Sequence, residues 1–172
     1  LVGLNTGGSI TSSYSTSRVD GYKGVGGLVG NNNYGNITSS YSTGVVSGLG
    51  DLGGLVGNNW GSITASYSTG SINGVNVAGG LVGSNWMGRI TASYSTSAVS
   101  GNEGVGGAGG GGDPSRVYNS VWDIETSGQT SSVGGIGKTT ARMQTLSTFL
   151  NAGWDFVDET SNGTCDYWQM SP

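Results

Sequence analysis

Apolar and polar residues alternate in a short segment, residues 63–69, that recurs along the chain. Successive side chains of a β-strand point to opposite faces, so this alternation predicts a strand with one buried side. The expected inward row is Ile63, Ala65 and Tyr67. The expected outward row is Thr64, Ser66 and Ser68. Small and large residues would then alternate along the buried side.

The segment belongs to a repeat of 26 to 27 residues, since Leu1, Leu28, Leu55 and Leu81 follow one another at steps of 27, 27 and 26. Four copies cover residues 1–104, and a degenerate fifth begins near Gly106. The other columns are Asn5, Asn32, Asn59 and Asn85; Ile10, Ile37, Ile63 and Ile90; Tyr14, Tyr41, Tyr67 and Tyr94; and Val19, Val46, Ile72 and Val99.

A parallel β-solenoid, or β-helix, is the fold that this repeat predicts. Helical repeats are excluded because the units hold many glycines and few helix-forming residues. One short strand cannot bury its apolar face alone, whereas stacked coils hydrogen-bonded about 4.8 Å apart can. The Leu, Ile, Tyr and Val columns would form a continuous interior. The Asn column, Asn5, Asn32, Asn59 and Asn85, would form an internal amide ladder at a corner.

The units "GGLVGNN" and "GSITASYSTG" resemble GLUG-motif repeats, and the tail from "VYNSVWDIETSGQ" onward is similar to the segment that often follows them. This resemblance implies an extracellular β-helical stalk or adhesive module. Such repeats occur in large secreted or surface-anchored bacterial proteins, including haemagglutinin-like adhesins and certain surface proteases. The chain departs from the pattern at "GVGGAGGGGDP", where the Leu-Val pair is missing and Ala108 takes the Leu position, which predicts a loosened coil.

The C-terminal part has a different composition and is expected to cap the stack. Residues 105–137 form the degenerate fifth repeat and a Gly-rich loop, and residues 138–172 the cap. One or two short helices should begin at Thr139 or Thr140 and end at Gly153. Aromatic segments around Asn162 and Gly163 predict a β-hairpin. The helices are expected to lay an apolar face over the stack, formed by Met143, Leu146, Phe149 and Leu150.

Composition and charge narrow the partners. The chain has 172 residues, 36 of them glycine, with six Lys and Arg against ten Asp and Glu, and it has no basic block for nucleic acid. No apolar run approaches the roughly 20 residues that span a bilayer. The chain begins inside a repeat, which suggests a processed subunit or a piece of a longer protein. The single cysteine, Cys165, allows no internal disulfide.

Catalytic chemistry finds little support in these residues. The chain has no His and one Cys, which disfavours a zinc site or a Ser-His-Asp arrangement. Asp123 and Glu125, two apart on an expected strand, are the candidates for an acid/base pair or a cation site, with solvated carboxylates as the alternative. The prediction is a protein that is not an enzyme, with no catalytic residue, no metal site and no cofactor.

Repeated hydroxyl side chains predict a flat outward face that serves for solvation, for contact with a fibre or glycan, or for ordering water as an ice-binding face does. Trp60 and Trp86 add exposed rings on which a sugar can stack. The candidate ligand or assembly face consists of Thr11, Thr38, Thr64, Thr91, Ser40, Ser66, Ser93, Trp60 and Trp86.

Taken together, the sequence favours a bacterial extracellular or cell-surface β-solenoid that is structural and adhesive, either a stalk or a head-to-tail filament subunit. Its expected partners are a second copy or upstream repeats, joined end to end, and glycans or a host or cell surface. The first alternative is a carbohydrate- or ice-binding module that uses the Thr/Ser face. A carboxylate-dependent glycan-active enzyme is the less favoured one.

Overall fold

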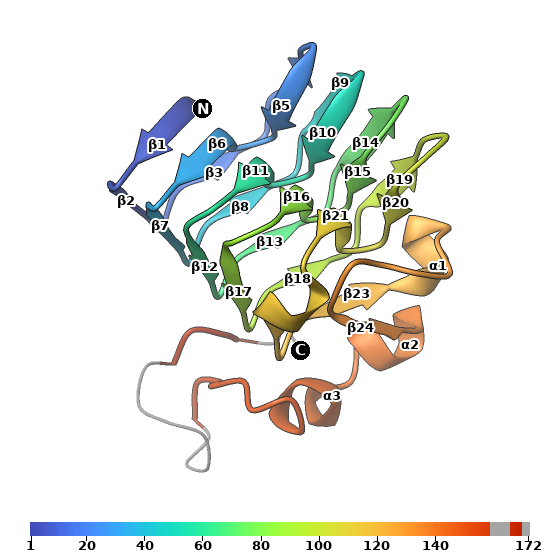
Figure 1. Cartoon of the computed structure of the whole chain (residues 1–172). Helices are drawn as coiled ribbons and strands as arrows, with labels where there is room; N and C mark the ends of the chain where they lie inside the picture. The colour runs from blue at the N-terminus through green and yellow to red at the C-terminus, as the bar shows by residue number, and fades with distance from the viewer. Residues whose placement is uncertain (159–165, 170–172) are drawn as a thin grey trace.

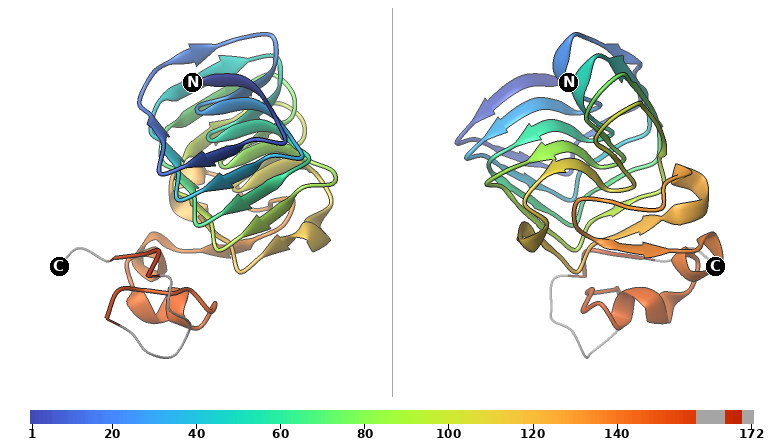
Figure 2. Two further views of the ribbon diagram at one scale, coloured as in Figure 1. Left: turned by 90° about the vertical axis from the view of Figure 1, so that its left-hand side faces the viewer. Right: turned by 45° about the vertical axis from the view of Figure 1, so that its right-hand side comes forward.

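The computed structural model describes residues 1–158 and 166–169 and is a stack of β-coils, each about one repeat long (Figure 1). Every pairing between named strands is parallel, and each strand from β1 to β23 pairs with its counterpart one repeat away. The view along the stack in Figure 2 shows the coils following one another behind the N-terminal one. The predicted all-β parallel solenoid is confirmed.

Four full coils contain five strands each. The first holds β1 (Val2–Thr6), β2 (Ser9–Thr11), β3 (Tyr14–Ser15), β4 (Val19–Asp20) and β5 (Lys23–Gly26). The second holds β6 (Val29–Asn33), β7 (Asn36–Thr38), β8 (Tyr41–Ser42), β9 (Val45–Gly48) and β10 (Gly50–Gly53). The third holds β11 (Val56–Asn59), β12 (Ser62–Thr64), β13 (Tyr67–Ser68), β14 (Ser71–Gly74) and β15 (Ala78–Gly79). The fourth holds β16 (Val82–Asn85), β17 (Arg89–Thr91), β18 (Tyr94–Ser95), β19 (Ala98–Ser100) and β20 (Val105–Gly106).

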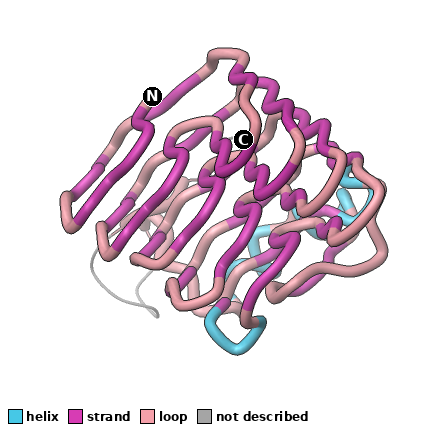
Figure 3. The backbone as a smooth tube through the Cα atoms, turned by 45° about the horizontal axis from the view of Figure 1, so that its top comes forward, coloured by secondary structure: helices cyan, strands magenta, loops and turns pink. Residues whose placement is uncertain are grey.

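Corresponding strands of successive coils form five parallel sheets, visible as rows of strands in Figure 3. The β1 sheet runs β1-β6-β11-β16-β21 and the β2 sheet β2-β7-β12-β17-β22. The β3 sheet runs β3-β8-β13-β18-β23-β24, the β4 sheet β4-β9-β14-β19, and the β5 sheet β5-β10-β15-β20. The repeat columns of the sequence are therefore rows of side chains that lie next to one another in space.

The strand alternation predicted for residues 63–69 is wrong beyond Thr64. Ala65 has a φ of 48°, a left-handed conformation, and breaks the segment into β12 and β13. The same corner recurs at Ser12, Ser39, Ala92 and Asn119. A left-handed residue between two strands reverses which side chains point inward. As a result Ser66 and Ser68 are buried, whereas Tyr67 lies on the outside.

Two apolar cores run along the stack. The larger contains Leu28, Leu55, Leu81 and the Val and Ile residues of the β1 and β2 sheets, and the smaller contains Val46, Ile72 and Val99 with Leu52. Between the cores, the β1 and β5 sheets approach closely. A Cβ built on Gly57 would lie 2.5 Å from the carbonyl carbon of Gly24, so glycine is required at this approach.

The fifth repeat continues the stack in register, which corrects the expectation of a loosened coil. It comprises β21 (Gly109–Gly112), the short 3-10 helix η1 (Pro114–Arg116), β22 (Val117–Tyr118) and β23 (Val121–Asp123). Ala108 lies in the Leu column, where its carbonyl accepts from the amide of Leu81 at 2.8 Å. Trp122 occupies a serine column and covers Gly107, where a Cβ would lie 1.9 Å from the indole. The large ring fills space that the small side chains leave.

Residues that follow β23 cover the end of the stack, and the chain then continues outside the coils. After α1 (Ile124–Ser127), the chain returns along the last coil, where Ser132 Oγ accepts from the amides of Ala108 and Gly109. Strand β24 (Ile136–Lys138) then pairs with β23. The expected cap at residues 138–172 is therefore not what covers the end of the interior. Trp122 and the segment around Ser132 do so.

Two short helices, α2 (Thr140–Met143) and α3 (Leu146–Leu150), follow at the predicted place, and Thr139 caps α2. They lie beside the outer face of the β3 sheet (Figure 1), where Met143 and Phe149 pack with Val121. The side chain of Leu146, which was expected in the apolar face, is exposed. Phe156 and Trp168 form one isolated parallel bridge, which contradicts the predicted antiparallel hairpin. The predicted turn at Asn162 and Gly163, like Cys165, lies outside the described residues.

Candidate functional site

The four repeated asparagines lie at a buried corner and form a continuous amide ladder. The Nδ2 groups of the first three donate to the Oδ1 one coil further on, at 2.9 Å from Asn5 to Asn32, 2.8 Å from Asn32 to Asn59 and 2.8 Å from Asn59 to Asn85. All four Nδ2 groups also donate to a backbone carbonyl of their own coil, as from Asn32 to Gly35 at 3.1 Å. The ladder satisfies buried polar groups and holds neighbouring coils in register.

A second ladder, formed by serine hydroxyls, was missed by the sequence analysis. It contains Ser13, Ser40, Ser66, Ser93 and Ser120. The Ser66 hydroxyl donates to the carbonyl of Thr64 at 2.8 Å and accepts from the amide of Ser40 at 3.1 Å. We call this row the Ser ladder. It satisfies the backbone at the left-handed corner, where the regular strand ladder is interrupted.

The predicted flat face of Thr and Ser is wrong, because Ser40, Ser66 and Ser93 belong to the buried Ser ladder. The next serine row is buried as well, comprising Ser15, Ser42, Ser68 and Ser95. Only the threonine row keeps its outward position on the β2 sheet, with Thr11 exposed and Thr38, Thr64 and Thr91 half-buried. One row of threonines remains where three hydroxyl rows were expected.

The four repeated tyrosines lie outside the coil, which corrects their predicted place in the interior. Their rings stack one above another on the β3 sheet, with centroids 5.2, 4.8 and 4.8 Å apart from Tyr14 to Tyr41, Tyr67 and Tyr94. Burial raises the pKa of the Tyr94 hydroxyl, and the neighbouring Tyr67 raises it further. The stack is thus a row of contacts between coils on the outer surface.

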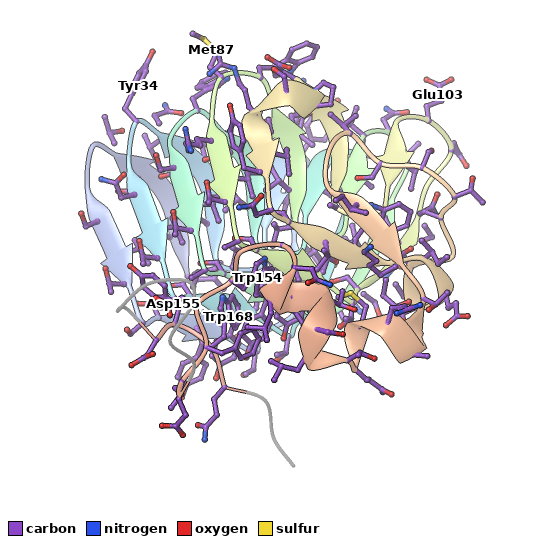
Figure 4. The ribbon with its side chains drawn as sticks, turned by 90° about the horizontal axis from the view of Figure 1, so that it is seen from below. Tyr34, Met87, Glu103, Trp154, Asp155 and Trp168 are labelled. Carbon is purple, nitrogen blue, oxygen red and sulfur yellow. The ribbon has the colours of Figure 1, made fainter. Side chains whose placement is uncertain are left out.

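Aromatic residues of the C-terminal segment cover the last part of this Tyr stack. The Tyr94 ring lies 6.2 Å from Trp154 and 5.6 Å from Trp168, centroid to centroid, and Figure 4, seen from below, shows the two tryptophans close together. A cavity of about 440 Å³ lies between them and α2. Its hydroxyl and carboxylate groups on Thr126, Thr140 and Asp123 are hydrogen-bonded to one another. These rings and hydrogen bonds hold the C-terminal segment against the β3 sheet.

Asp123 and Glu125 both serve to hold helix ends. Asp123 ends β23 and caps α1, accepting from the amides of Glu125 at 2.9 Å and Thr126 at 3.2 Å. It also accepts from Thr140 Oγ1 at 2.8 Å, and Glu125 accepts from the Thr140 amide at 2.8 Å. Glu125 lies in α1, not on the expected strand. The two carboxylates join α1 to α2.

Asp123 is expected to make the attachment of the C-terminal segment sensitive to acid. Burial by itself raises the pKa of Asp123, but the hydrogen bonds from Thr140, Thr126 and the backbone outweigh it and bring this pKa below its ordinary value. A carboxylate with a lowered folded pKa stabilises the fold above its unfolded pKa of about 3.9, and the contribution is lost as pH falls through the folded pKa.

In Asp123→Asn, we therefore expect the free energy of unfolding at neutral pH to fall by about 1 to 3 kcal/mol. Below about pH 4, the free energy of unfolding should decrease less with falling pH in this variant than in the wild type. Urea unfolding monitored by tryptophan fluorescence at neutral and acidic pH measures both effects. Glu125→Gln, at an exposed carboxylate, is the matched control and should change stability by less than about 0.5 kcal/mol. Equal effects of the two substitutions would contradict the role assigned to Asp123.

Trp60 and Trp86 lie in consecutive coils and have 41% and 61% of their surface exposed. They border a groove of about 430 Å³ in the angle between the β1 and β5 sheets. The β1 sheet contributes Asn58 and Ser84, and the β5 sheet contributes Lys23 and Asp51. We call this the Trp groove. The sequence analysis identified its two rings but not its polar residues, which come from a different part of each coil.

Metal-ligating groups do not gather in the part of the chain that the structure describes, where no three His, Cys, Asp or Glu side chains lie together. None of the described helices has the length and apolar character needed to cross a membrane.

Comparison with known proteins agrees with the repeat. The family model of the GLUG motif matches two adjacent segments, residues 21–47 and 48–73. These segments coincide with two successive steps of the 26- to 27-residue period. The matches confirm the resemblance to GLUG-motif repeat proteins. No curated protein and no solved structure matches the chain.

Proposed function

We propose that this GLUG-repeat protein is a non-catalytic structural module, a stalk of the bacterial cell surface that carries adhesive contacts. The GLUG motifs and the solenoid together indicate a structural repeat protein. The observation that carries the proposal is the use of the repeated side chains. The Asn ladder, the Ser ladder and the Tyr stack each join one coil to the next. Because each coil contacts only its neighbours, a solenoid held together by such contacts becomes longer when coils are added.

The N-terminal coil supports extension of the stack by another coil. Strands β1 to β5 are each the last strand of their sheet, so one side of each has no strand partner within the described residues. The apolar columns are also open there, since Leu1 is 66% exposed while Leu28, one coil further on, is 2% exposed. Another coil of the same pattern, from a second copy or from upstream repeats, would continue both the backbone pairing and the interior.

The closed C-terminal end of the stack favours a stalk over a head-to-tail filament. Trp122 and the segment around Ser132 occupy the place where a following coil would sit. A second copy would then meet the first through the two N-terminal coils, giving a closed pair of molecules, whereas head-to-tail contacts would give open filaments.

Sedimentation velocity across a range of concentrations tests whether two molecules pair through their N-terminal coils. We expect concentration-dependent pairing that is lost in Ile10→Lys, because Ile10 packs against the open larger core. Thr11→Lys, on the same strand but facing outward, is the control and should pair like the wild type. A monomer at every concentration, with slowly exchanging amides in β1 to β3, would contradict an N-terminal docking end. Filaments in electron micrographs would contradict the stalk and support a head-to-tail filament subunit instead.

Location at the cell surface rests on the resemblance to GLUG units of secreted and surface-anchored bacterial proteins. Antibody labelling of intact bacterial cells tests it. Labelling without permeabilisation is the expected result, and labelling only after permeabilisation would contradict it.

A further inference from the structure

We infer that the Trp groove binds a neutral oligosaccharide, with pyranose rings against Trp60 and Trp86 and sugar hydroxyls on the polar residues beside them. The first argument is the aromatic surface. The two residues directly follow β11 and β16, neighbouring strands of the β1 sheet that are paired on both sides. Flat, exposed indoles at the ends of paired strands offer contact area at little cost in conformational entropy.

The second argument is the polar network on the floor of the groove. The Asp51 carboxylate accepts from Ser84 Oγ at 2.6 Å and lies 3.2 Å from Lys23 Nζ. Asn58 Nδ2 donates to Asn31 Oδ1 at 3.0 Å. Donors and acceptors therefore stand side by side next to the rings. A sugar hydroxyl both donates and accepts, so this mixed network suits a polyol.

The third argument is the backbone at Asp51. Its φ is 51°, a left-handed value that costs energy for a residue other than glycine. In the coil before it, the corresponding position is Gly24, with a φ of 68°. An aspartate at a position suited to glycine brings a carboxylate to Ser84 and Lys23.

Charge and pairing argue against the other classes of ligand. The one cation of the groove, Lys23, is paired with Asp51, and the chain carries a net charge of −4, so polyanions are disfavoured. An extended peptide would need an open sheet edge for strand addition. Strands β11 and β16, which form this part of the groove, have partners on both sides. A neutral sugar chain meets neither obstacle.

Binding to an array of neutral hexose, pentose and N-acetylhexosamine oligosaccharides, with sulfated oligosaccharides for comparison, tests the inference. Calorimetry with each neutral oligosaccharide that binds then gives its affinity. We expect saturable binding that is about tenfold weaker in Trp60→Ala and in Trp86→Ala, and also weaker in Asp51→Asn.

Met87→Ala is the matched control. Met87 has the same 61% exposure as Trp86 and projects from the same edge as Tyr34 (Figure 4), but it does not line the groove. Its affinity should equal that of the wild type, and the circular dichroism of all variants should be unchanged. Absence of binding to every neutral oligosaccharide, binding to sulfated ones alone, or unchanged affinity in the double variant Trp60→Ala/Trp86→Ala would overturn the inference. A change of oligomeric state in that double variant would also overturn it and assign the groove to contact between copies. Sedimentation of Ile10→Lys tests N-terminal pairing and does not involve the Trp groove. The proposed function and the oligosaccharide site can therefore be contradicted independently of each other.

Discussion

Replacing Ser66 with aspartate is expected to unfold the solenoid, whereas the same replacement at Thr64 is expected to leave it folded. The two residues lie two positions apart and both hydroxyls belong to repeated columns. Ser66 is fully buried in the Ser ladder, and Thr64 faces outward on β12. The same substitution at the two positions therefore distinguishes a buried hydroxyl row from an outward-facing, half-buried one.

The size of the effect follows from the charge. A buried carboxylate without a cationic partner costs several kcal/mol, and the hydrogen bond from Ser40 to the hydroxyl of Ser66 would be disturbed as well. A domain with a stability of about 5 to 15 kcal/mol loses much of it. Thr64→Asp should cost about 1 kcal/mol, chiefly through lower strand propensity.

Thermal and urea unfolding followed by circular dichroism distinguish these outcomes. Ser66→Ala, which removes the hydroxyl without adding charge, should lie between the two, with a loss of about 1 to 3 kcal/mol. Equal stability of Ser66→Asp and Thr64→Asp would mean that the serine row faces solvent.

Breaking the Asn ladder at Asn59 is expected to cost about 3 kcal/mol or more in the free energy of unfolding. Asn59 donates to Asn85 and to the carbonyl of Gly61, and it accepts from Asn32 at 2.8 Å. Alanine removes all of these bonds and leaves buried partners unsatisfied, each at a cost of about 1 to 3 kcal/mol. Water cannot replace them readily because Asn59 is fully buried.

Two further substitutions calibrate the Asn59→Ala result in urea unfolding. Asn5→Ala, at the end of the ladder, should cost less, because Asn5 has a ladder partner on one side only among the described residues. Asn36→Ala, at an exposed position in β7, should cost less than about 0.5 kcal/mol. If the three alanine variants were equally stable, the ladder would contribute nothing to the stack.

The columns of the solenoid were predictable because they depend on spacing alone. Asn32 and Asn59 are one repeat apart, so stacking at that period places their amides together whatever the path of the coil between them. The direction of a side chain depends instead on the local backbone. Ala65 and Ala92 hold left-handed corners, and alanine carries no signal for that conformation, so the rule of strand alternation assigned Ser66 and Tyr67 to the wrong faces.

Two other features, the Trp groove and the closed end of the stack, became apparent only from the path of the chain in three dimensions. The Trp groove joins Asp51 to Ser84, residues more than one repeat apart that meet because the backbones approach closely at Gly83, where a Cβ would lie 2.4 Å from the carbonyl carbon of Asp51. The closing role of Trp122 did leave a signal, since a tryptophan replaces serine in the column of Ser95. A large ring in a column of small residues indicates the end of a stack, where no further coil needs the space.

Hydrogen exchange of the side-chain amides, measured by NMR, tests most directly the claim that the repeated residues serve contacts between coils. The Nδ2 hydrogens of Asn32 and Asn59 are predicted to exchange slowly, at rates close to those of the core backbone amides, because both hydrogens of each group are bonded and buried. Exchange of these hydrogens as fast as that of the exposed Asn36 would contradict the stacked solenoid and the structural role assigned to its repeats.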